Sequence, residues 1–101
     1  MWLFVMFDLP VGSREERKNY AAFRAHLLHA GFSALQKSVY AGNFKNDESA
    51  RAAERKAERR LPPRGNVAFL RLTDAQFATL SIFENAAPAS PPEALPECLI
   101  L

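Results

Sequence analysis

Residues 2–7, WLFVMF, followed by Asp8, Leu9 and Pro10, decide how the rest of the sequence folds. The run has no polar side, which favours a central strand covered on both faces. It is far too short to cross a bilayer. Pro10 and Gly12 then break the strand. The strand therefore ends on a single carboxylate, Asp8, and that end is where we look for function.

The next segment has the start and stop signals of a helix over residues 13–30. Ser13 and Glu16 match a capping box. At the other end, Gly31 suits a left-handed residue, and Phe32 can fold back in a Schellman motif. Apolar residues recur at helical spacing between these ends and form the stripe Tyr20, Phe23, Leu27 and Ala30.

The remainder alternates short strands with helices. Residues 32–44 are β-like but interrupted at 36–38, which indicates two short strands joined by a bend or bulge. A second helix is expected over residues 47–60, ended by Pro62-Pro63. Its stripe of small residues indicates close approach to the sheet and consists of Ala50, Ala53, Ala57 and Leu61.

Residues 67–72 predict another strand, and two short elements follow it. Thr73 and Gln76 can cap a single helical turn, and residues 81–83 can add a short strand. Residues 85–96 are rich in Pro and Ala and predict a linker. Residues 97–101 end the sequence as an apolar, strand-like segment.

The order βαββαβ over residues 1–84 predicts an α+β, ferredoxin-like fold with two helices on one face of an antiparallel sheet. The other face needs a cover, and the extra C-terminal strand 97–101 needs a partner. Both needs are met if two copies form a homodimer that packs sheet to sheet and each tail extends the partner's sheet. The simpler alternative is that the tail pairs within its own chain.

Composition narrows the class of protein to which the sequence can belong. The 101 residues are 49% hydrophobic, which suits one globular domain. The single cysteine, Cys98, can form neither an internal disulfide nor a zinc cluster, which favours a reducing cytoplasm. We find no signal peptide or membrane-spanning pattern.

Basic residues outnumber acidic ones only by 13 to 11, but they cluster. Clustered cations suit the phosphates of nucleic acid, and such contacts are blind to sequence. The ordinary alternative is a solvated helix face, partly self-paired through Glu54 and Glu58. The candidate nucleic-acid-binding residues are Arg14, Arg17, Lys18, Arg24, Lys37, Arg51, Arg55 and Arg59.

Two segments together resemble a known family. The first is MFDLP at residues 6–10 with ERK at 16–18, Tyr20 and Phe23-Arg24 beyond it. The second is Gly31-Phe32 followed by LQKSVY at 35–40. In this order and spacing they are similar to the second of the universal CRISPR-associated proteins, the small subunit of the spacer-acquisition machinery.

That resemblance implies a ferredoxin-like homodimer. It also implies metal-dependent endonuclease activity on single-stranded RNA or double-stranded DNA, and a role in bridging dimers of the CRISPR integrase subunit while holding duplex DNA. The family's metal-binding aspartate corresponds to Asp8, as a Mg²⁺ ligand, and its motif aromatic to Tyr40, both catalytic candidates. Arg17 matches an early functional arginine, whereas Ala34 stands where some members have another.

A single carboxylate is a poor Mg²⁺ site, but two copies of Asp8 meeting across a two-fold axis can share one ion. The residues alone leave other roles open: Asp8 can end the strand through an Asx turn, and Tyr40 can be a core aromatic. His26 and His29 suit neighbouring surface positions better than a catalytic triad.

Three functions are therefore considered. The first is a CRISPR adaptation subunit that binds duplex DNA and carries a metal-dependent endonuclease centre. The second is a stand-alone, toxin-like endoribonuclease or DNase. The third, a ferredoxin-like RNA-binding module without a CRISPR role, is disfavoured because no aromatic-rich RNP strand is present.

Overall fold

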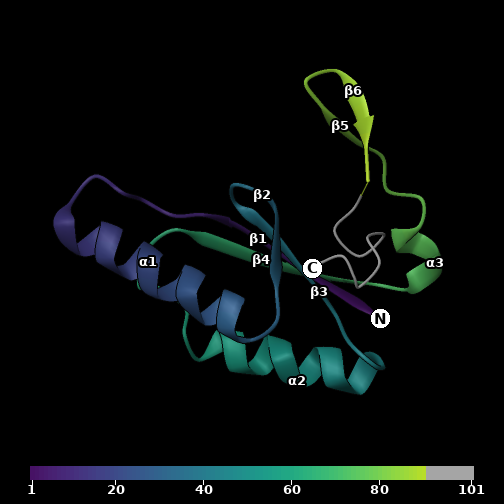
Figure 1. Cartoon of the computed structure of the whole chain (residues 1–101). Helices are drawn as coiled ribbons and strands as arrows, with labels where there is room; N and C mark the ends of the chain where they lie inside the picture. Colours follow the sequence, from purple (N-terminus) through teal and green to yellow (C-terminus); the bar gives the residue numbers. More distant parts are fainter. Residues whose placement is uncertain (91–101) are drawn as a thin grey trace.

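The computed structural model describes residues 1–90, in which β1 (Trp2–Asp8) lies inside a four-stranded antiparallel sheet of order β2-β3-β1-β4 (Figure 1). β1 pairs with β3 on one side and with β4 on the other. The remaining elements are α1 (Arg14–His29), β2 (Ser33–Gln36), β3 (Val39–Asn43), α2 (Asp47–Glu58), β4 (Asn66–Leu72), α3 (Asp74–Phe77), β5 (Ile82–Glu84) and β6 (Ala87–Ala89). This topology confirms the α+β, ferredoxin-like prediction.

The ends of α1 follow the sequence signals. The Ser13 side chain accepts from the Glu16 amide at 3.1 Å, and the Glu16 carboxylate accepts from the Ser13 amide at 3.0 Å. At the other end, the Phe32 amide donates to the Leu27 carbonyl and the Gly31 amide to the Leu28 carbonyl. These are the paired hydrogen bonds of a Schellman motif, as predicted.

The two faces of β1 carry different covers. Leu3, Val5 and Phe7 face both long helices and form the larger core with Phe23 and Leu27. The alternate residues point to the other face. There Trp2 stacks on Phe77 of α3 with ring centroids 3.7 Å apart, and Phe4 meets the same ring edge-on. The single turn of α3 thus covers one end of the second face.

Two alanines let α2 lie close to the sheet. Ala50 and Ala57 are fully buried, as their spacing indicates. Leu61 was expected on the same stripe, but it is 43% exposed. The reason is that α2 ends at Glu58 and the chain turns before Leu61 reaches the helix face.

One cation from the sheet holds α2 in place. Arg71 of β4 donates from Nη1 to Glu54 at 2.7 Å, and its Nε lies 3.3 Å from Asp47. This clamp joins the first turn and the second half of the helix to the sheet. The self-pairing predicted on α2 through Glu54 and Glu58 is not formed within the described residues: Glu54 pairs with Arg71 of β4. The i,i+4 ion pair on α2 joins Asp47 and Arg51 instead.

A small hairpin stands off the main sheet (Figure 1). The expected strand at 81–83 appears as β5, but residues 85–89, expected in a linker, instead form a turn and β6. Asn85 and Ala86 both have positive φ, which matches the two-residue loop of a right-twisted hairpin. The rest of the expected linker and the strand at 97–101 lie outside the described residues. No helix within residues 1–90 is long and apolar enough to cross a membrane.

Gly65 allows the closest backbone approach at the end of β1. Its φ is +99°, and a Cβ there would lie 2.7 Å from the Asp8 carbonyl oxygen. Gly31 offers a matched control because its φ is +97° but no atom lies within 4 Å of its Cβ position.

We therefore expect Gly65→Ala to destabilise the fold more than Gly31→Ala. Gly31→Ala carries only the left-handed penalty of about 1–2 kcal/mol, whereas Gly65→Ala adds a clash with backbone that cannot rotate away. Urea unfolding of the two variants at one protein concentration measures the difference. Equal losses would show that the chain at residues 8 and 65 moves apart freely.

Candidate functional site

Asp8 lies where β1 emerges from the core. It is exposed, although the preceding Phe7 is buried. Because side chains alternate along a strand, Asp8 belongs to the face of the sheet away from the long helices. β3 pairs with β1 only up to Met6, so only β4 accompanies Asp8.

Asn66 is the residue directly opposite Asp8 in the β1–β4 ladder. Cross-strand partners in an antiparallel pair share a face, with Cβ atoms about 4.5–5.5 Å apart. An amide oxygen therefore accompanies the carboxylate at this edge. Sequence reasoning missed Asn66, because the register of β1 on β4 is needed to find it. The Gly65-Asn66 pair at the start of β4 was the available signal.

Tyr40 lies on the opposite side of the sheet from Asp8. Tyr40 pairs with Val5, is 2% exposed, and stacks on Phe7 with ring centroids 5.6 Å apart. It belongs to the core beneath the helices. Within one chain, Tyr40 and Asp8 are therefore not brought together, and the structure shows Tyr40 as a packing residue.

The donors around Asp8 fit a Mg²⁺ ion shared between two chains better than one held by a single chain. Residues 1–90 contain no group of three or more His, Cys, Asp or Glu placed to hold a metal ion. Mg²⁺ prefers oxygen ligands and keeps several waters and substrate phosphates, so one or two carboxylates suffice. Asp8 and Asn66 carry oxygen atoms of the kind that Mg²⁺ prefers, and a second such pair would have to come from another chain.

The predicted nucleic-acid-binding residues are all exposed, but they are not equally free. Arg17 donates from Nη1 to the carbonyls of Val11 and Gly12, at 3.2 and 3.4 Å, and so holds the β1–α1 loop. Arg51 donates to Asp47 at 2.6 Å, and this hydrogen bond lowers the pKa of the Asp47 carboxyl. Within the described part of the chain, the residues in no such pair are Arg14, Lys18, Arg24, Lys37, Arg55 and Arg59.

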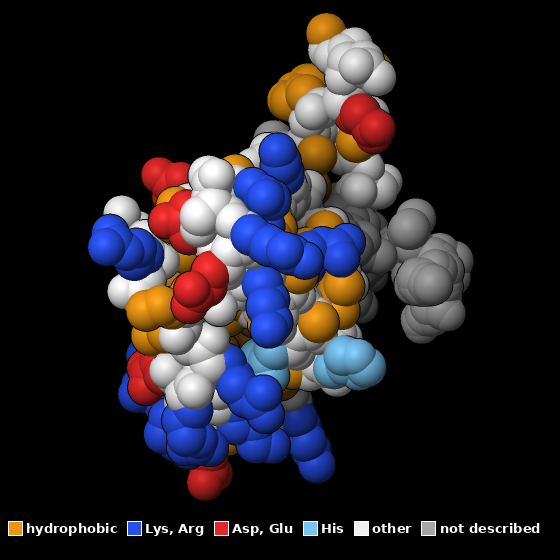
Figure 2. Space-filling model, turned by 90° about the vertical axis from the view of Figure 1, so that its left-hand side faces the viewer, with side chains coloured by type: hydrophobic (Ala, Val, Ile, Leu, Met, Phe, Trp, Pro, Cys, Tyr) orange, Lys and Arg blue, Asp and Glu red, His pale blue; other side chains and the backbone are white. Residues whose placement is uncertain are grey.

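Lys and Arg side chains form a band on one face of the molecule, interrupted by the two histidines of α1 (Figure 2). The C-terminal ends of α1 and α2 lie close together, since the charges of Arg60 and Lys56 act on His26 of α1. Basic side chains gathered on one face are more useful for binding a polyanion than the small net charge suggests.

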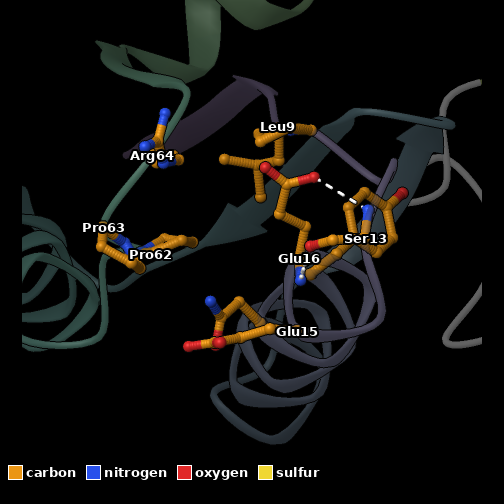
Figure 3. Close-up of a pocket in the computed structure, with 10 residues that line it drawn as sticks. Leu9, Ser13, Glu15, Glu16, Pro62, Pro63 and Arg64 are labelled. Carbon is orange, nitrogen blue, oxygen red and sulfur yellow. Dashed lines mark hydrogen bonds between the residues drawn. The ribbon is translucent and has the colours of Figure 1, made fainter.

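A pocket of about 200 Å³ opens beside the end of β1. Pro62, Pro63 and Arg64 form one side, and Ser13, Glu15 and Glu16 from the start of α1 form the other, with Leu9 between them (Figure 3). Pro10, Asn19 and Tyr20 complete the lining. Asp8 does not line the pocket, but it immediately precedes Leu9. Sequence reasoning missed this pocket because its two sides are far apart in the chain.

His26 is an unusual residue on the basic face. Its Nε2 atom is buried and has no hydrogen-bond partner among the described residues. Burial lowers the pKa of His26 below its ordinary value of 6.5, and the charges of Arg60, His29 and Lys56 lower it further. The neutral imidazole is therefore the form that the fold accommodates.

Comparison with known proteins assigns the chain to a family. The model of the family "CRISPR associated protein Cas2" matches residues 1–80, from β1 through α3. The chain belongs to the Cas2 family.

Individual relatives agree with this assignment. The "CRISPR-associated endoribonuclease Cas2" of Parvibaculum lavamentivorans is 39% identical over 83 residues, which cover 82% of each chain. The protein of the same name from Ligilactobacillus salivarius is 44% identical over 77 residues, 76% of each chain. That of Flavobacterium psychrophilum is 35% identical over 88 residues, 87% of this chain and 76% of the relative.

The lowered pKa of His26 predicts acid sensitivity. A histidine that resists protonation in the fold gives full stability above pH 6.5, and that stability is lost as the pH falls below 6.5. We expect His26→Gln to flatten this loss between about pH 8 and pH 5.5. Urea midpoints at the two pH values measure it.

His29→Gln on the same helix is the control, because His29 is exposed. It should retain most of the acid sensitivity. The explanation fails if His26→Gln unfolds with the same pH dependence as the unchanged protein.

Proposed function

We propose that this chain is a CRISPR adaptation subunit: a cytoplasmic homodimer that binds duplex DNA, bridges dimers of the integrase subunit, and carries a Mg²⁺-dependent endonuclease centre at Asp8. Membership of the Cas2 family is the observation on which this rests. The relatives are named endoribonucleases, which supports nuclease chemistry and adds single-stranded RNA to the substrates to be tested.

The exposed basic side chains support nucleic-acid binding. Their band on one face suits the phosphates of a duplex, because each cation neutralises backbone charge and reads no base. Spacer sequences vary without limit, so a subunit that holds them benefits from such contacts.

Two unpartnered apolar features support a homodimer. Beyond the part covered by α3, the second face of the sheet presents Leu70, which is 45% exposed. The β5–β6 hairpin presents Phe83, which is 66% exposed. An isolated two-stranded hairpin is marginal in water. A second copy that packs face to face covers both features, and the outer edge of β4, which pairs with no other strand of residues 1–90, offers a place for strand pairing.

Dimerisation also completes the candidate catalytic centre. Asp8 lies on the same face of the sheet as Leu70, at the end of β1, so face-to-face packing can bring two Asp8 carboxylates toward one axis. Asp8 and Asn66 would hold a Mg²⁺ ion there, and the ion would supply activation of water and neutralisation of charge on the scissile phosphate. The exposed basic residues orient the nucleic-acid strand.

We expect Asp8→Asn to abolish Mg²⁺-dependent cleavage and leave the dimer intact, because the substitution removes charge but little volume. Leu70→Lys should lose both properties: it keeps Asp8 but weakens the dimer, and cleavage is lost with the dimer. Sedimentation measures assembly, and single-stranded RNA and duplex DNA substrates with and without Mg²⁺ measure cleavage.

Leu28→Lys is the matched control for Leu70→Lys. Leu28 is 41% exposed but lies on α1, away from the open sheet face. It should retain both properties. Cleavage at the same rate by Asp8→Asn and the unchanged protein would remove Asp8 from the chemistry.

The basic residues make a separate prediction about duplex binding. The double variant Arg24→Ala/Arg59→Ala should reduce the slope of log affinity against log salt by roughly two, since each phosphate contact contributes about 0.9. Arg51→Ala is the control, because Arg51 is already paired with Asp47. An unchanged slope in the double variant would rule out these contacts.

A stand-alone, toxin-like endonuclease is the second candidate. The name shared by the relatives favours it over a purely structural subunit. Binding to the purified integrase subunit distinguishes the two candidates. Binding of the integrase subunit by the Asp8→Asn variant supports the adaptation role. Cleavage by the unchanged protein, with no binding of the integrase subunit by either protein, supports the stand-alone enzyme.

A further inference from the structure

The pocket between the start of α1 and the α2–β4 loop is too small for most whole ligands but suits one flat group. Its volume of about 200 Å³ lies below the usual range of small-molecule sites, roughly 300–1,000 Å³. Leu9, Pro10, Pro62 and Pro63 give it apolar sides, and Tyr20, held edge-on against Phe7 at 5.9 Å, adds an aromatic one.

Residues of opposite charge lie on the two sides of this hollow. Arg64 lies on one side and Glu15 on the other, both exposed (Figure 3). Within residues 1–90, neither side chain is engaged in an ion pair or a side-chain hydrogen bond. Glu16 is partly engaged, since one of its oxygens accepts from the Ser13 amide.

This arrangement discriminates between possible occupants. Two carboxylates disfavour a phosphate inside the pocket, and Arg64 disfavours a protein lysine or arginine there. A nucleotide satisfies both sides: its neutral base enters between the prolines and Tyr20, while its phosphate stays outside near Arg64. Single-stranded RNA is commonly read in this way, with unstacked bases inserted into apolar pockets and hydrogen-bonded along their edges.

We propose that this pocket binds one unstacked base of single-stranded RNA, and that Glu15 selects bases bearing an exocyclic amino group. The inference rests on the proposed action on RNA, and it adds a base preference to a surface otherwise blind to sequence. A carboxylate accepts hydrogen bonds only. It therefore favours cytosine, which presents its N4 amino donor, over uracil, which presents an O4 acceptor at the same position.

The location ties the pocket to the candidate catalytic centre. Leu9 and Pro10 directly follow Asp8, and Gly65, which directly follows Arg64, packs against the Asp8 backbone. The two sides of the pocket thus meet at the residue proposed to hold the metal ion. A base seated here fixes which part of the strand lies near Asp8.

The test compares oligo(C) with oligo(U) of equal length, bound to the full chain in chelator so that no strand is cut. We expect oligo(C) to bind roughly tenfold more tightly, the lower part of the range for one good base contact. Glu15→Ala should remove the preference. Arg64→Gln should weaken both oligonucleotides by a similar factor and preserve the preference.

Glu48→Ala is the matched control, because Glu48 occupies the first turn of α2 as Glu15 does that of α1, but lies outside the pocket. It should leave the preference intact. Equal binding of the two oligonucleotides, or a preference that survives Glu15→Ala, would overturn the inference while leaving the proposed nuclease in place.

If no RNA binds, NMR with single nucleotides distinguishes a failure of the base-binding pocket from a failure of the proposed nuclease function. Cytidine monophosphate should shift the Leu9 methyl resonances more than uridine monophosphate does, and Glu15→Ala should abolish the difference. Shifts caused by a lysine-rich peptide but by neither nucleotide would make the pocket a protein-docking site and overturn the inference. Loss of RNA binding with retained cytidine shifts would instead contradict the proposed function.

Discussion

The burial of β1 on both faces is the constraint on which the rest of the structure depends. Leu3 and Val5 are completely buried under the helices, and Trp2 and Phe4 are almost as buried under α3 on the other face. Each interior strand residue also needs hydrogen-bond partners on two sides, which β3 and β4 supply. Asp8 is the first residue of the strand free of this burial, so its position is set by where the core ends.

The same alternation divides the functional residues. Asp8 and Asn66 share one face of the sheet, and Tyr40 lies on the other among core residues. One chain therefore presents a carboxylate and an amide at this edge, and residues 1–90 hold no cluster of three or more His, Cys, Asp or Glu that could bind a metal ion. A centre with more oxygen donors has to draw them from a second copy or from the substrate. This is a physical reason to look for function in an assembly.

Local signals predicted most of the fold. The cap at Ser13, the Schellman motif at Gly31 and the alanine spacing of α2 each depend on residues close in sequence, so the pattern carried the information. Two predictions were wrong because they concern the path of the chain beyond a local pattern. Leu61 continues the helical spacing, but the turn toward Pro62 takes it off the helix. Residues 85–89 have a linker's composition, yet Asn85 and Ala86 adopt the positive φ of a hairpin turn.

Only part of the candidate site could be predicted from the sequence, because the rest depends on contacts between residues far apart in the chain. Asp8 could be found because it ends an apolar run. Asn66 is found only through its register with β1, and the pocket joins residues 9–20 to residues 62–64, which no local pattern relates. The pairing of Arg51 with Asp47 was likewise ambiguous in sequence, because Glu54 and Glu58 offered competing partners for the helix cations.

The distribution of acids explains how a chain with a net charge of only +2 presents a strongly basic face. Glu16 is engaged in a helix cap, Asp47 and Glu54 in the Arg71 clamp, and Asp74 with the N-terminal amine at 3.0 Å. Asp47, Glu54 and Asp74 each join two elements through an ion pair, which offsets their charge locally. Most basic side chains of the described residues are in no such pair. Part of the negative charge thus serves the fold, while most of the positive charge remains available to a polyanionic partner.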